Sequence, residues 1–475
     1  MSVPARAPRV LVVGGGLSGL ASAWFALQAL PDADVTVLER EAAPGGCARS
    51  DVVDGYLVDR GPNGFLTNVP ESYELAQAVG LGDRLTPATD AARQRSLWFR
   101  GALRALPTGP GAFLTSELLS PLGKARVALE PFIGRAPAGS DETVHGFATR
   151  RLGPEFADAF IAPMVLGITA GDATRTSLRS LFPRLARLED DHGGLVRGMI
   201  ARRRAARTDP SEQVGGPSGP GGRLTSFADG GAETLIEGLH RALGDRVRTG
   251  AEVVGLEHAE AGGYRVRLAS GEILDADRVV VATPSFVAAE LLQGVAPDAV
   301  DDLRAIPYAG VRVLGLGYDR VDVPRPLDGF GFLVPRGHGV RMLGCLWTST
   351  LFPWQAPEGK VLLRVIAGGL PDPEFVDLSD DEALAIVRRD LDRSMGIVAE
   401  PEMVHHVRWQ RAIPQYWQGH GERVARAMDA ARRAGGLHLT GNAYYGVGLN
   451  DCVRDARRIA DELRAAVAGE TTAPA

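Results

Sequence analysis

Lysine and cysteine are scarce in this chain, and long apolar runs are absent. Lys124 and Lys360 are the only lysines, so a lysine-based mechanism has almost no candidates. The cysteines are odd in number and widely spaced, at Cys47, Cys345 and Cys452, which argues against a disulfide framework and a zinc site. No uninterrupted apolar stretch approaches the roughly 18 residues that a membrane-spanning helix needs. We therefore expect a cytoplasmic protein without a metal, either soluble or resting on a membrane surface.

An excess of basic charge is also missing. The formal net charge of −6 gives no electrostatic footprint for nucleic acid, so we expect no nucleic-acid partner. The chain has 475 residues, of which 45% are hydrophobic and 23% charged, which is an ordinary globular composition. This length is too great for one simple core and predicts about two or three domains.

The first forty residues have the pattern of a dinucleotide-binding unit. An aliphatic run at 10–13 enters a glycine-rich turn at 14–19, and a second aliphatic run at 35–38 ends in Glu39. Such a turn leaves the N–H groups and the positive end of the following helix free for phosphates. A carboxylate about 20 residues later can accept both ribose hydroxyls and would repel a 2′-phosphate, which disfavours NADP. The predicted contacts in this unit are Gly14, Gly15, Gly16, Leu17, Ser18, Gly19 and Glu39.

Two further glycine-rich segments follow Glu39. The paired glycines of 44–49 let a second stretch of backbone approach the pyrophosphate, and Arg49 can add charge. The alternative is a plain turn before a hairpin. Gly61-Pro62-Asn63-Gly64 ends a predicted strand, and its small and rigid residues would let a flat ring press against the backbone. Taken alone, Pro-Asn-Gly is equally a turn signal, and the sequence leaves both readings open.

A fourth glycine-rich segment lies near the C-terminus. Residues 439–452 run from an aliphatic strand through four glycines into a helix with periodic apolar positions. In a flavoprotein this second helix N-terminus would place backbone N–H groups at the O2/N1 edge of the ring, where they stabilise negative charge on the reduced flavin. A C-capping glycine loop is the alternative interpretation.

The order of patterns along the chain predicts an α/β protein with interleaved domains. We expect a discontinuous, FAD-binding, Rossmann-like domain of the glutathione-reductase type from 1–90, 222–295 and 405–475. A helical domain is inserted at 107–206. A mixed-sheet substrate domain is expected from 91–106 and 296–404. The Pro-, Gly- and Ser-rich stretch 207–221 is predicted to be a mobile loop.

Over nearly its whole length the chain resembles the protoporphyrinogen oxidase family, especially its oxygen-dependent bacterial members. The segments that carry the resemblance are VVGGGLSGLASA at 12–23, GPNGFL at 61–66, GITAGDATRTSLRSLFP at 167–183, GFGFLVP at 329–335, AIPQYWQGH at 412–420 and GNAYYGVGLNDCV at 441–453. The first marks only the wider FAD superfamily, whereas the others are more specific. Gly64 departs from the family, whose members usually have serine there.

The resemblance implies non-covalent FAD and a set of contacting residues. Besides the glycine-rich turn and Glu39, the cofactor contacts expected are Arg40, Gly46, Arg49, Gly61, Pro62, Asn63, Gly64, Val253, Trp409, Gly441, Asn442, Val447, Gly448 and Leu449. The substrate contacts expected are Asn63, Arg95, Gly167, Ala170, Gly171, Leu333 and Phe352. Arg95 would pair with a propionate, and Leu333 and Phe352 would sandwich tetrapyrrole rings. A solvated role is equally open for Arg95.

The resemblance also implies a reaction and partners. Protoporphyrinogen IX would be oxidised to protoporphyrin IX in haem biosynthesis, by hydride transfer from bridge carbons to flavin N5, with O₂ as acceptor and hydrogen peroxide as product. Aromaticity drives the reaction, so the protein supplies orientation and a dry slot, and no acid or base is assigned. A peripheral membrane surface on the inner face of the cell membrane and a homodimer are further partners consistent with the family. For the membrane surface, ordinary helix packing is an equal alternative.

Four rival functions stay open. A coproporphyrinogen III oxidase would share fold and motifs but needs a more basic pocket, because its substrate carries four propionates. Amine oxidases commonly hold a lysine near flavin N5, and several attach the flavin through cysteine. This chain has no lysine at 311–318 and no cysteine at 409–416. Carotenoid desaturases belong to the same superfamily. A flavin-free prenyl-binding module of the GDP-dissociation-inhibitor type is disfavoured by the intact glycine turn and Glu39.

Overall fold

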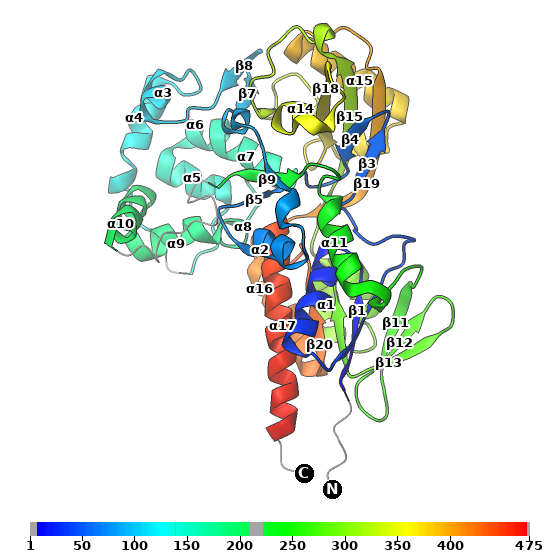
Figure 1. The fold of residues 1–475 in the computed structure, drawn as a ribbon. Coiled ribbons are helices and arrows are strands. Elements are labelled where there is room, and N and C mark those ends of the chain that lie inside the picture. The colour runs from blue at the N-terminus through cyan, green and yellow to red at the C-terminus, as the bar shows by residue number, and fades with distance from the viewer. Residues whose placement is uncertain (1–6, 138, 209–221, 473–475) are drawn as a thin grey trace.

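The computed structural model describes residues 7–137, 139–208 and 222–472 (Figure 1). Most of the stretch predicted as a mobile loop, 209–221, lies outside the described residues. Its first two residues, 207 and 208, belong to the last turn of α10 (Leu195–Thr208). The sheet-rich part with both termini, the helical part and the larger sheet form three regions of the ribbon.

A five-stranded parallel sheet forms the centre of the nucleotide-binding part, in the order β10-β2-β1-β14-β20. Its strands are β1 (Arg9–Val13), β2 (Asp34–Leu38), β10 (Val247–Arg248), β14 (Arg278–Val281) and β20 (Leu437–Leu439). Val10 and Val12 face one core, and Leu11 and Val13 face the other. Burial on both faces explains the continuous aliphatic run. Because strands from distant parts of the chain share this sheet, the predicted discontinuous α/β domain is confirmed.

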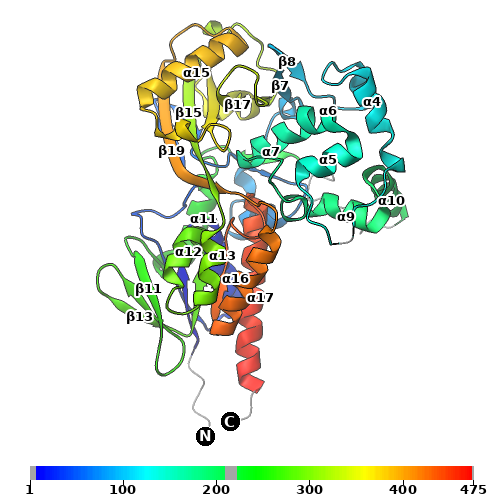
Figure 2. The ribbon, with the colours of Figure 1, turned by 180° about the vertical axis from the view of Figure 1, so that it is seen from behind.

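Helices and a small antiparallel sheet cover the two faces. On one face pack α1 (Leu17–Ala29), α2 (Glu71–Ala78), α11 (Glu233–Leu243) and α17 (Leu449–Thr472). On the other lie β11 (Val253–His258), β12 (Tyr264–Leu268), β13 (Ile273–Ala276), α12 (Ser285–Leu291), α13 (Val300–Arg304) and α16 (His420–Ala434), as Figure 2 shows for the helices. α1 and α17, from opposite ends of the chain, lie side by side.

The second large sheet has seven strands in the order β19-β15-β18-β17-β16-β7-β8. They are β7 (Ser96–Phe99), β8 (Ala102–Ala105), β15 (Tyr308–Asp319), β16 (Gly331–Leu333), β17 (Met342–Leu346), β18 (Lys360–Gly368) and β19 (Met403–Pro414), with α14 (Thr348–Leu351) and α15 (Asp380–Met395) beside them. β16 and β7 pair in parallel and the other neighbours antiparallel, which makes this the expected mixed sheet. The predicted boundary at 405 falls inside β19, whose pairing with β15 ties it to this sheet.

Short antiparallel ladders connect the parts. β3 (Ser50–Val53) pairs with β4 (Tyr56–Asp59), and β9 (Leu224–Phe227) pairs with β5 (Phe65–Leu66) and β6 (Leu85–Pro87). β4 is buried along its whole length. It packs on β15, because added methyl groups at Gly315 and Gly317 would press on the side chains of Val58 and Tyr56.

The region 110–208 is helical, as the apolar periodicity predicts. Its main elements are α3 (Pro110–Thr115), α4 (Pro121–Ala128), η3 (Glu130–Phe132), α5 (Val144–Leu152), α7 (Ala162–Thr169), α8 (Leu178–Leu181), α9 (Pro183–His192) and α10. Arg151, fully buried, donates to Glu130 Oε1 at 2.9 Å and to Glu189 Oε1 at 2.6 Å. These ion pairs join η3, α5 and α9. Among the described residues, no helix is long and apolar enough to cross a membrane.

We predict that the Arg151 ion pairs are essential to the helical region. Arg151→Met leaves the buried Glu130 carboxylate without a cation and leaves Glu189 with Arg150 alone, which should lower the free energy of unfolding by about 3–5 kcal/mol. The exposed pair of Arg179 with Asp190 gives a matched control, since Arg179→Met should cost about 1 kcal/mol or less. Urea unfolding measures both, and equal losses would contradict the prediction.

The same ion pairs make the stability of the fold depend on pH in acid. Although burial opposes it, hydrogen bonds from Arg150 and Arg151 hold the pKa of Glu189 at about 2. A carboxylate whose folded-state pKa is depressed stabilises the fold above its unfolded pKa and loses that contribution as pH falls through the folded value. The free energy of unfolding of the native chain should therefore fall steadily as pH drops from about 4.5 to 2. Arg151→Met should weaken this dependence, because only Arg150 then remains beside Glu189.

Candidate cofactor and substrate site

Glu39 is fixed by backbone N–H groups at the end of β2. Gly15 N–H donates to its Oε2 at 2.7 Å, and Glu41 N–H donates to its Oε1 at 2.8 Å. The carboxylate is 8% exposed. A Cβ on Gly15 would lie 2.8 Å from the Glu39 Cβ, so this approach needs glycine. Each carboxylate oxygen keeps a free lone pair, and the acid can accept two hydroxyl groups as predicted.

The glycines of the turn differ in what surrounds them. A methyl group on Gly19 would clash with the Gly14 carbonyl, so Gly19 permits close packing of α1. A methyl group on Gly16 would meet no protein atom within 4 Å. No side chain caps the N-terminus of α1, which begins at Leu17. The turn therefore holds a cradle with free N–H groups and open space at Gly16, which fits a pyrophosphate.

The second glycine pair lies against this turn. Gly45 N–H donates to the Gly15 carbonyl at 2.8 Å, and a Cβ on Gly46 would lie 3.5 Å from Gly16 Cα. Arg49 points instead to Glu233, with Nε 3.4 Å from Oε1. The structure thus brings Gly46 to the cradle, while the charge of Arg49 is already paired.

The C-terminal glycine segment reaches the same place. Ser18 near the start of α1 hydrogen-bonds Cys452 in the first turn of α17, so the two helix N-termini are adjacent. Asp451 Oδ2 accepts Gly448 N–H at 3.2 Å just before α17 begins. Val447, Gly448 and Leu449 lie at this start, and Gly441 and Asn442 follow β20 directly. The predicted convergence of both chain ends is present.

Tyr416 is a positioning residue that the sequence analysis did not single out. Its hydroxyl donates to Asn442 O at 2.5 Å and accepts Gly446 N–H at 2.9 Å, bracing the glycine segment at two points. Its ring stacks on His420 with centroids 4.0 Å apart. Burial lowers the pKa of His420 to about 4, so this imidazole is neutral. The only signal was the position of Tyr416 within 412–420, one of the family-like segments.

Thr283 is a second residue that was missed. It follows β14, and its buried Oγ1 has no hydrogen-bond partner among the described residues. It stands between the glycine-rich turns, since a Cβ on Gly14 would lie 3.5 Å from Thr283 Cγ2 and a Cβ on Gly441 3.9 Å from Thr283 O. An orphaned hydroxyl at this edge fits a bound dinucleotide. Its place directly after a buried strand was the available signal.

The segment 61–64 is held from behind by three side-chain donations. Arg364 Nε donates to Asp59 O at 3.1 Å, Trp409 Nε1 to Arg60 O at 3.0 Å, and Arg364 Nη2 to Gly61 O. Asn63 Nδ2, by contrast, is buried with no partner in the described part of the chain. Three fixed carbonyls and one orphaned amide favour a ligand-facing segment over an ordinary turn.

Gly64 has a local reason for differing from serine. Its φ is +155°, and a Cβ there would clash with the Thr225 carbonyl of β9. A serine here would need a different backbone path, so the pairing of β5 with β9 explains why this chain has glycine at the position.

Four of the predicted substrate residues gather near the end of α7. A Cβ on Gly167 would lie 2.8 Å from Leu333 Cδ1, so α7 and β16 touch. Ala170 adopts a left-handed φ of 50° and its carbonyl accepts Leu370 N–H at 2.9 Å. Gly171 lies against Gln415, whose buried Oε1 has no partner among the residues described. Trp409 packs on the cluster of Ala170, which links this group to segment 61–64.

Arg95 and Phe352 lie in a neighbouring aromatic group. The Arg95 guanidinium stands 5.0 Å from the centroid of Phe330, and no ion pair of Arg95 occurs in the described part of the structure. Phe352 has no exposed surface and packs with Leu351, Phe330 and Trp354. Stacking by Phe352 therefore needs movement of its neighbours, whereas the half-buried Phe330 beneath Arg95 does not.

Two predicted contacts lie at the edge of the site. Arg40 is 64% exposed and pairs with Glu41 at 3.1 Å. Val253 begins β11, two residues after Ala251, whose N–H donates to the Glu39 carbonyl at 2.8 Å. This places Val253 near the acid, while Arg40 faces solvent.

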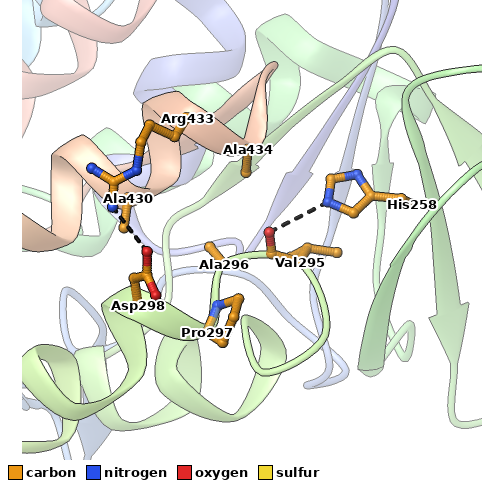
Figure 3. Close-up of a pocket in the computed structure, with 8 residues that line it drawn as sticks. All are labelled: His258, Val295, Ala296, Pro297, Asp298, Ala430, Arg433 and Ala434. Atoms are coloured by element: carbon orange, nitrogen blue, oxygen red, sulfur yellow. Dashed lines mark hydrogen bonds and ion pairs between the residues drawn. The ribbon is translucent and has the colours of Figure 1, made fainter.

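A separate hollow of about 330 Å³ opens on the nucleotide-binding part (Figure 3). His258 Nε2 lies 3.3 Å from Val295 O at one side, and Arg433 pairs with Asp298 at 3.1 Å at the other. None of the predicted site residues lines it. Within the described ranges, no group of three His, Cys, Asp or Glu side chains is arranged to hold a metal ion.

Comparison with known proteins gives one family and close relatives. The model of the family described as flavin containing amine oxidoreductase matches residues 17–464. A chloroplastic protoporphyrinogen oxidase of Oryza sativa subsp. japonica is 34% identical over 472 residues, covering 95% of this chain and 87% of the relative. A coproporphyrinogen III oxidase of Bacillus subtilis (strain 168) is 32% identical over 482 residues, covering 98% of both. A crystal structure from Exiguobacterium sp. 255-15, provisionally named as a protoporphyrinogen oxidase, has a TM-score of 0.81 at 26% identity and covers 96% of this chain and 99% of that one.

The contrast between Gly16 and Gly19 gives a test of the cradle. Gly16→Val adds a side chain where the protein leaves open space, so the FAD-free chain should unfold as the parent does while FAD binding is lost. Gly19→Val is the matched control, because it clashes with the Gly14 carbonyl and should destabilise the FAD-free chain itself. Thermal unfolding without FAD and flavin absorbance after reconstitution measure the two effects. Stoichiometric FAD on Gly16→Val would refute the cradle.

Proposed function

The chain belongs to the family of flavin containing amine oxidoreductases and uses FAD, and on this premise we propose that it oxidises protoporphyrinogen IX to protoporphyrin IX. Dioxygen is the acceptor. Three two-electron rounds remove three hydrides from bridge carbons and three protons, of which two come from pyrrole nitrogens and one from the fourth bridge carbon, and each round reduces one O₂ to hydrogen peroxide. FAD, when bound, carries the two electrons of each round.

The residues present suit this chemistry through position rather than acid or base catalysis. Gly16, Glu39, Asn63 and Thr283 would hold FAD at the carboxyl edge of the parallel sheet. Tyr416 would orient the N–H groups of the C-terminal glycine segment. Aromatisation supplies the driving force, so a fixed orientation and exclusion of water are the main requirements of the site.

One observation favours an apolar macrocycle as the substrate. Trp409 donates its indole N–H to Arg60 O, directly before the segment 61–64, and packs on the apolar cluster of Leu166, Ala170 and Leu343. An apolar wall therefore begins one side chain away from the predicted flavin segment. Arg95, without an ion pair in the described part, supplies a cation at the rim for a propionate.

Coproporphyrinogen III is the second candidate substrate. It is favoured by the full-length match to the Bacillus subtilis enzyme of that name. This substrate carries more propionates and would use further cations, and Arg336 is one, 3.6 Å from Asp172 next to Gly171. Its existing pairing makes Arg336 less available than Arg95, and for that reason we place protoporphyrinogen first.

Arg95 provides the test of substrate orientation. Arg95→Gln removes a charge-assisted hydrogen bond worth roughly 1.5–3 kcal/mol, so KM should rise about tenfold or more while kcat changes little. Arg95→Lys should recover part of the loss. Porphyrin fluorescence is followed with anaerobically prepared protoporphyrinogen and coproporphyrinogen in separate assays. If the parent oxidises neither above the spontaneous rate, the proposed function is wrong; an unchanged KM would remove only the role of Arg95.

We further propose that one surface of the helical region 110–208, formed by α3, α4, η3 and α10, rests on the inner face of the cell membrane, with the rest of the chain in the cytoplasm. Large apolar side chains are exposed there on adjoining elements: Leu114, Leu122, Leu129, Phe132, Met199 and Ile200. Phe132 and Leu122 are 81% and 82% exposed. α10, which carries Met199 and Ile200, packs on η3, which carries Phe132. A second copy of the chain stays a predicted partner.

Vesicle binding tests the membrane proposal. Phe132→Glu and Leu122→Glu should each lower the fraction that sediments with phospholipid vesicles severalfold, since burying one such side chain contributes about 1.5–3 kcal/mol. Val321→Glu is the matched control, because Val321 is 87% exposed but lies beside the seven-stranded sheet. Sedimentation that falls equally in all three variants, or that is absent in the parent, would contradict the proposal.

A further inference from the structure

Arg364 is a buried cation directly behind the segment 61–64. It lies on β18 and is 4% exposed. Its guanidinium donates through Nε to the Asp59 carbonyl at 3.1 Å and through Nη2 to the Gly61 carbonyl. One planar side chain therefore holds two carbonyl groups toward β18, that of Asp59 at the end of β4 and that of Gly61 at the start of the segment.

The Asp59 carboxylate acts electrostatically on Arg364, but no ion pair joins Arg364 to a carboxylate in the described part of the chain. The nearby Asp59 carboxylate is held by other donors: Ser50 Oγ at 2.7 Å, Gln355 Nε2 at 2.8 Å and Ala232 N at 3.0 Å. Burial lowers the pKa of Arg364 and raises the pKa of Asp59. A guanidinium nevertheless stays protonated in proteins, so a positive charge persists in this interior.

A buried charge is expected to have an opposite charge or a strong set of polar partners nearby. Two carbonyl groups, and an Asp59 carboxylate that already accepts three other hydrogen bonds, only partly meet that need. The orphaned Asn63 Nδ2 belongs to the same segment and independently indicates that something polar adjoins it. The flavin that this family binds supplies electron-rich oxygen and nitrogen atoms and gains negative charge when it is reduced.

We propose that Arg364 is a positioning residue that raises the reduction potential of the flavin. Its guanidinium holds the Asp59 and Gly61 carbonyl oxygens toward β18. Its positive charge lies on the other side of this backbone from the predicted flavin site and favours the negatively charged, reduced ring. The proposal rests on FAD at segment 61–64 and not on the identity of the substrate.

Arg312 offers a matched control in the same sheet. It lies on β15, which pairs with β18, and is fully buried. It also donates to two carbonyl groups, Leu378 O at 2.5 Å and Ser379 O at 3.3 Å, and it pairs with Asp380 at 3.0 Å. Those partners lie directly before α15 and at its first residue, away from segment 61–64. Loss of either arginine disturbs packing, but only Arg364 should affect the flavin.

The experiment compares Arg364→Met, Arg364→Lys and Arg312→Met as FAD-loaded protein. Midpoint potentials are measured by equilibration with a reference dye, without porphyrinogen, and thermal unfolding is measured on the FAD-free chains. Arg364→Met should shift the reduction equilibrium at least tenfold toward the oxidised flavin, which is about 30 mV for a two-electron couple. Arg364→Lys should keep the parent potential but bind FAD less tightly, and Arg312→Met should lose stability with an unchanged potential.

Several outcomes would overturn the proposal. These are a parent-like potential in Arg364→Met, an equal shift in Arg312→Met, or a tenfold shift in Arg364→Lys. If Arg364→Met retains no FAD, Arg364→Gln takes its place as an uncharged variant that keeps hydrogen-bond donors, and a parent-like potential in Arg364→Gln then overturns the proposal. If the potentials contradict this proposal, the porphyrinogen assays can still support the proposed function. If the chain oxidises no porphyrinogen, the potentials still test the role of Arg364, because they are measured without substrate.

Discussion

The site depends on the carboxyl edge of one parallel sheet. β1 ends at the glycine turn, β2 at Glu39, β14 at Thr283, and β20 at the C-terminal glycine segment. Parallel pairing forces these ends to one side, which is where an open α/β sheet binds its ligand. The remaining features refine this edge: Gly15 N–H fixes the acid, Gly16 leaves space, and two helix N-termini meet through Ser18 and Cys452. If the parallel order changed, no local motif could rebuild the cradle.

A second constraint joins this edge to the larger sheet. The carbonyls of Asp59, Arg60 and Gly61 are each bound by a side chain of β18 or β19. Trp409 takes part in this contact and also in the apolar cluster around Ala170. The face on which a substrate would lie is thereby fixed relative to segment 61–64. We infer that this stretch of chain and the larger sheet act as one rigid frame, because side chains of β18 and β19 bind the carbonyls of three successive residues.

The sequence predicted what depends on local pattern and missed what depends on distant pairing. The glycine spacing, Glu39 and the helical region follow from short-range geometry, and each is present. Tyr416 and Arg364 act on residues 26 and 303 positions away, and no periodicity marks such partners. The predicted boundary at 405 cut through β19 for the same reason, since strand pairing with β15 is invisible in a linear pattern.

Residue burial explains another difference between pattern and structure. The family resemblance implies a stacking role for Phe352. In the structure, however, Leu351, Phe330 and Trp354 pack around this side chain, and Phe330 is the ring that lies beneath Arg95. The residues that would meet a substrate, Arg95, Phe330 and Leu333, come from the loop before β7 and from β16 and its approach, whereas the cofactor edge belongs to the parallel sheet. Under the proposed function, side chains on this one strand pair could change substrate preference without disturbing the cradle. Relatives named for two different porphyrinogens can then match this chain at nearly equal identity, because substrate choice occupies few positions and the cofactor frame occupies many.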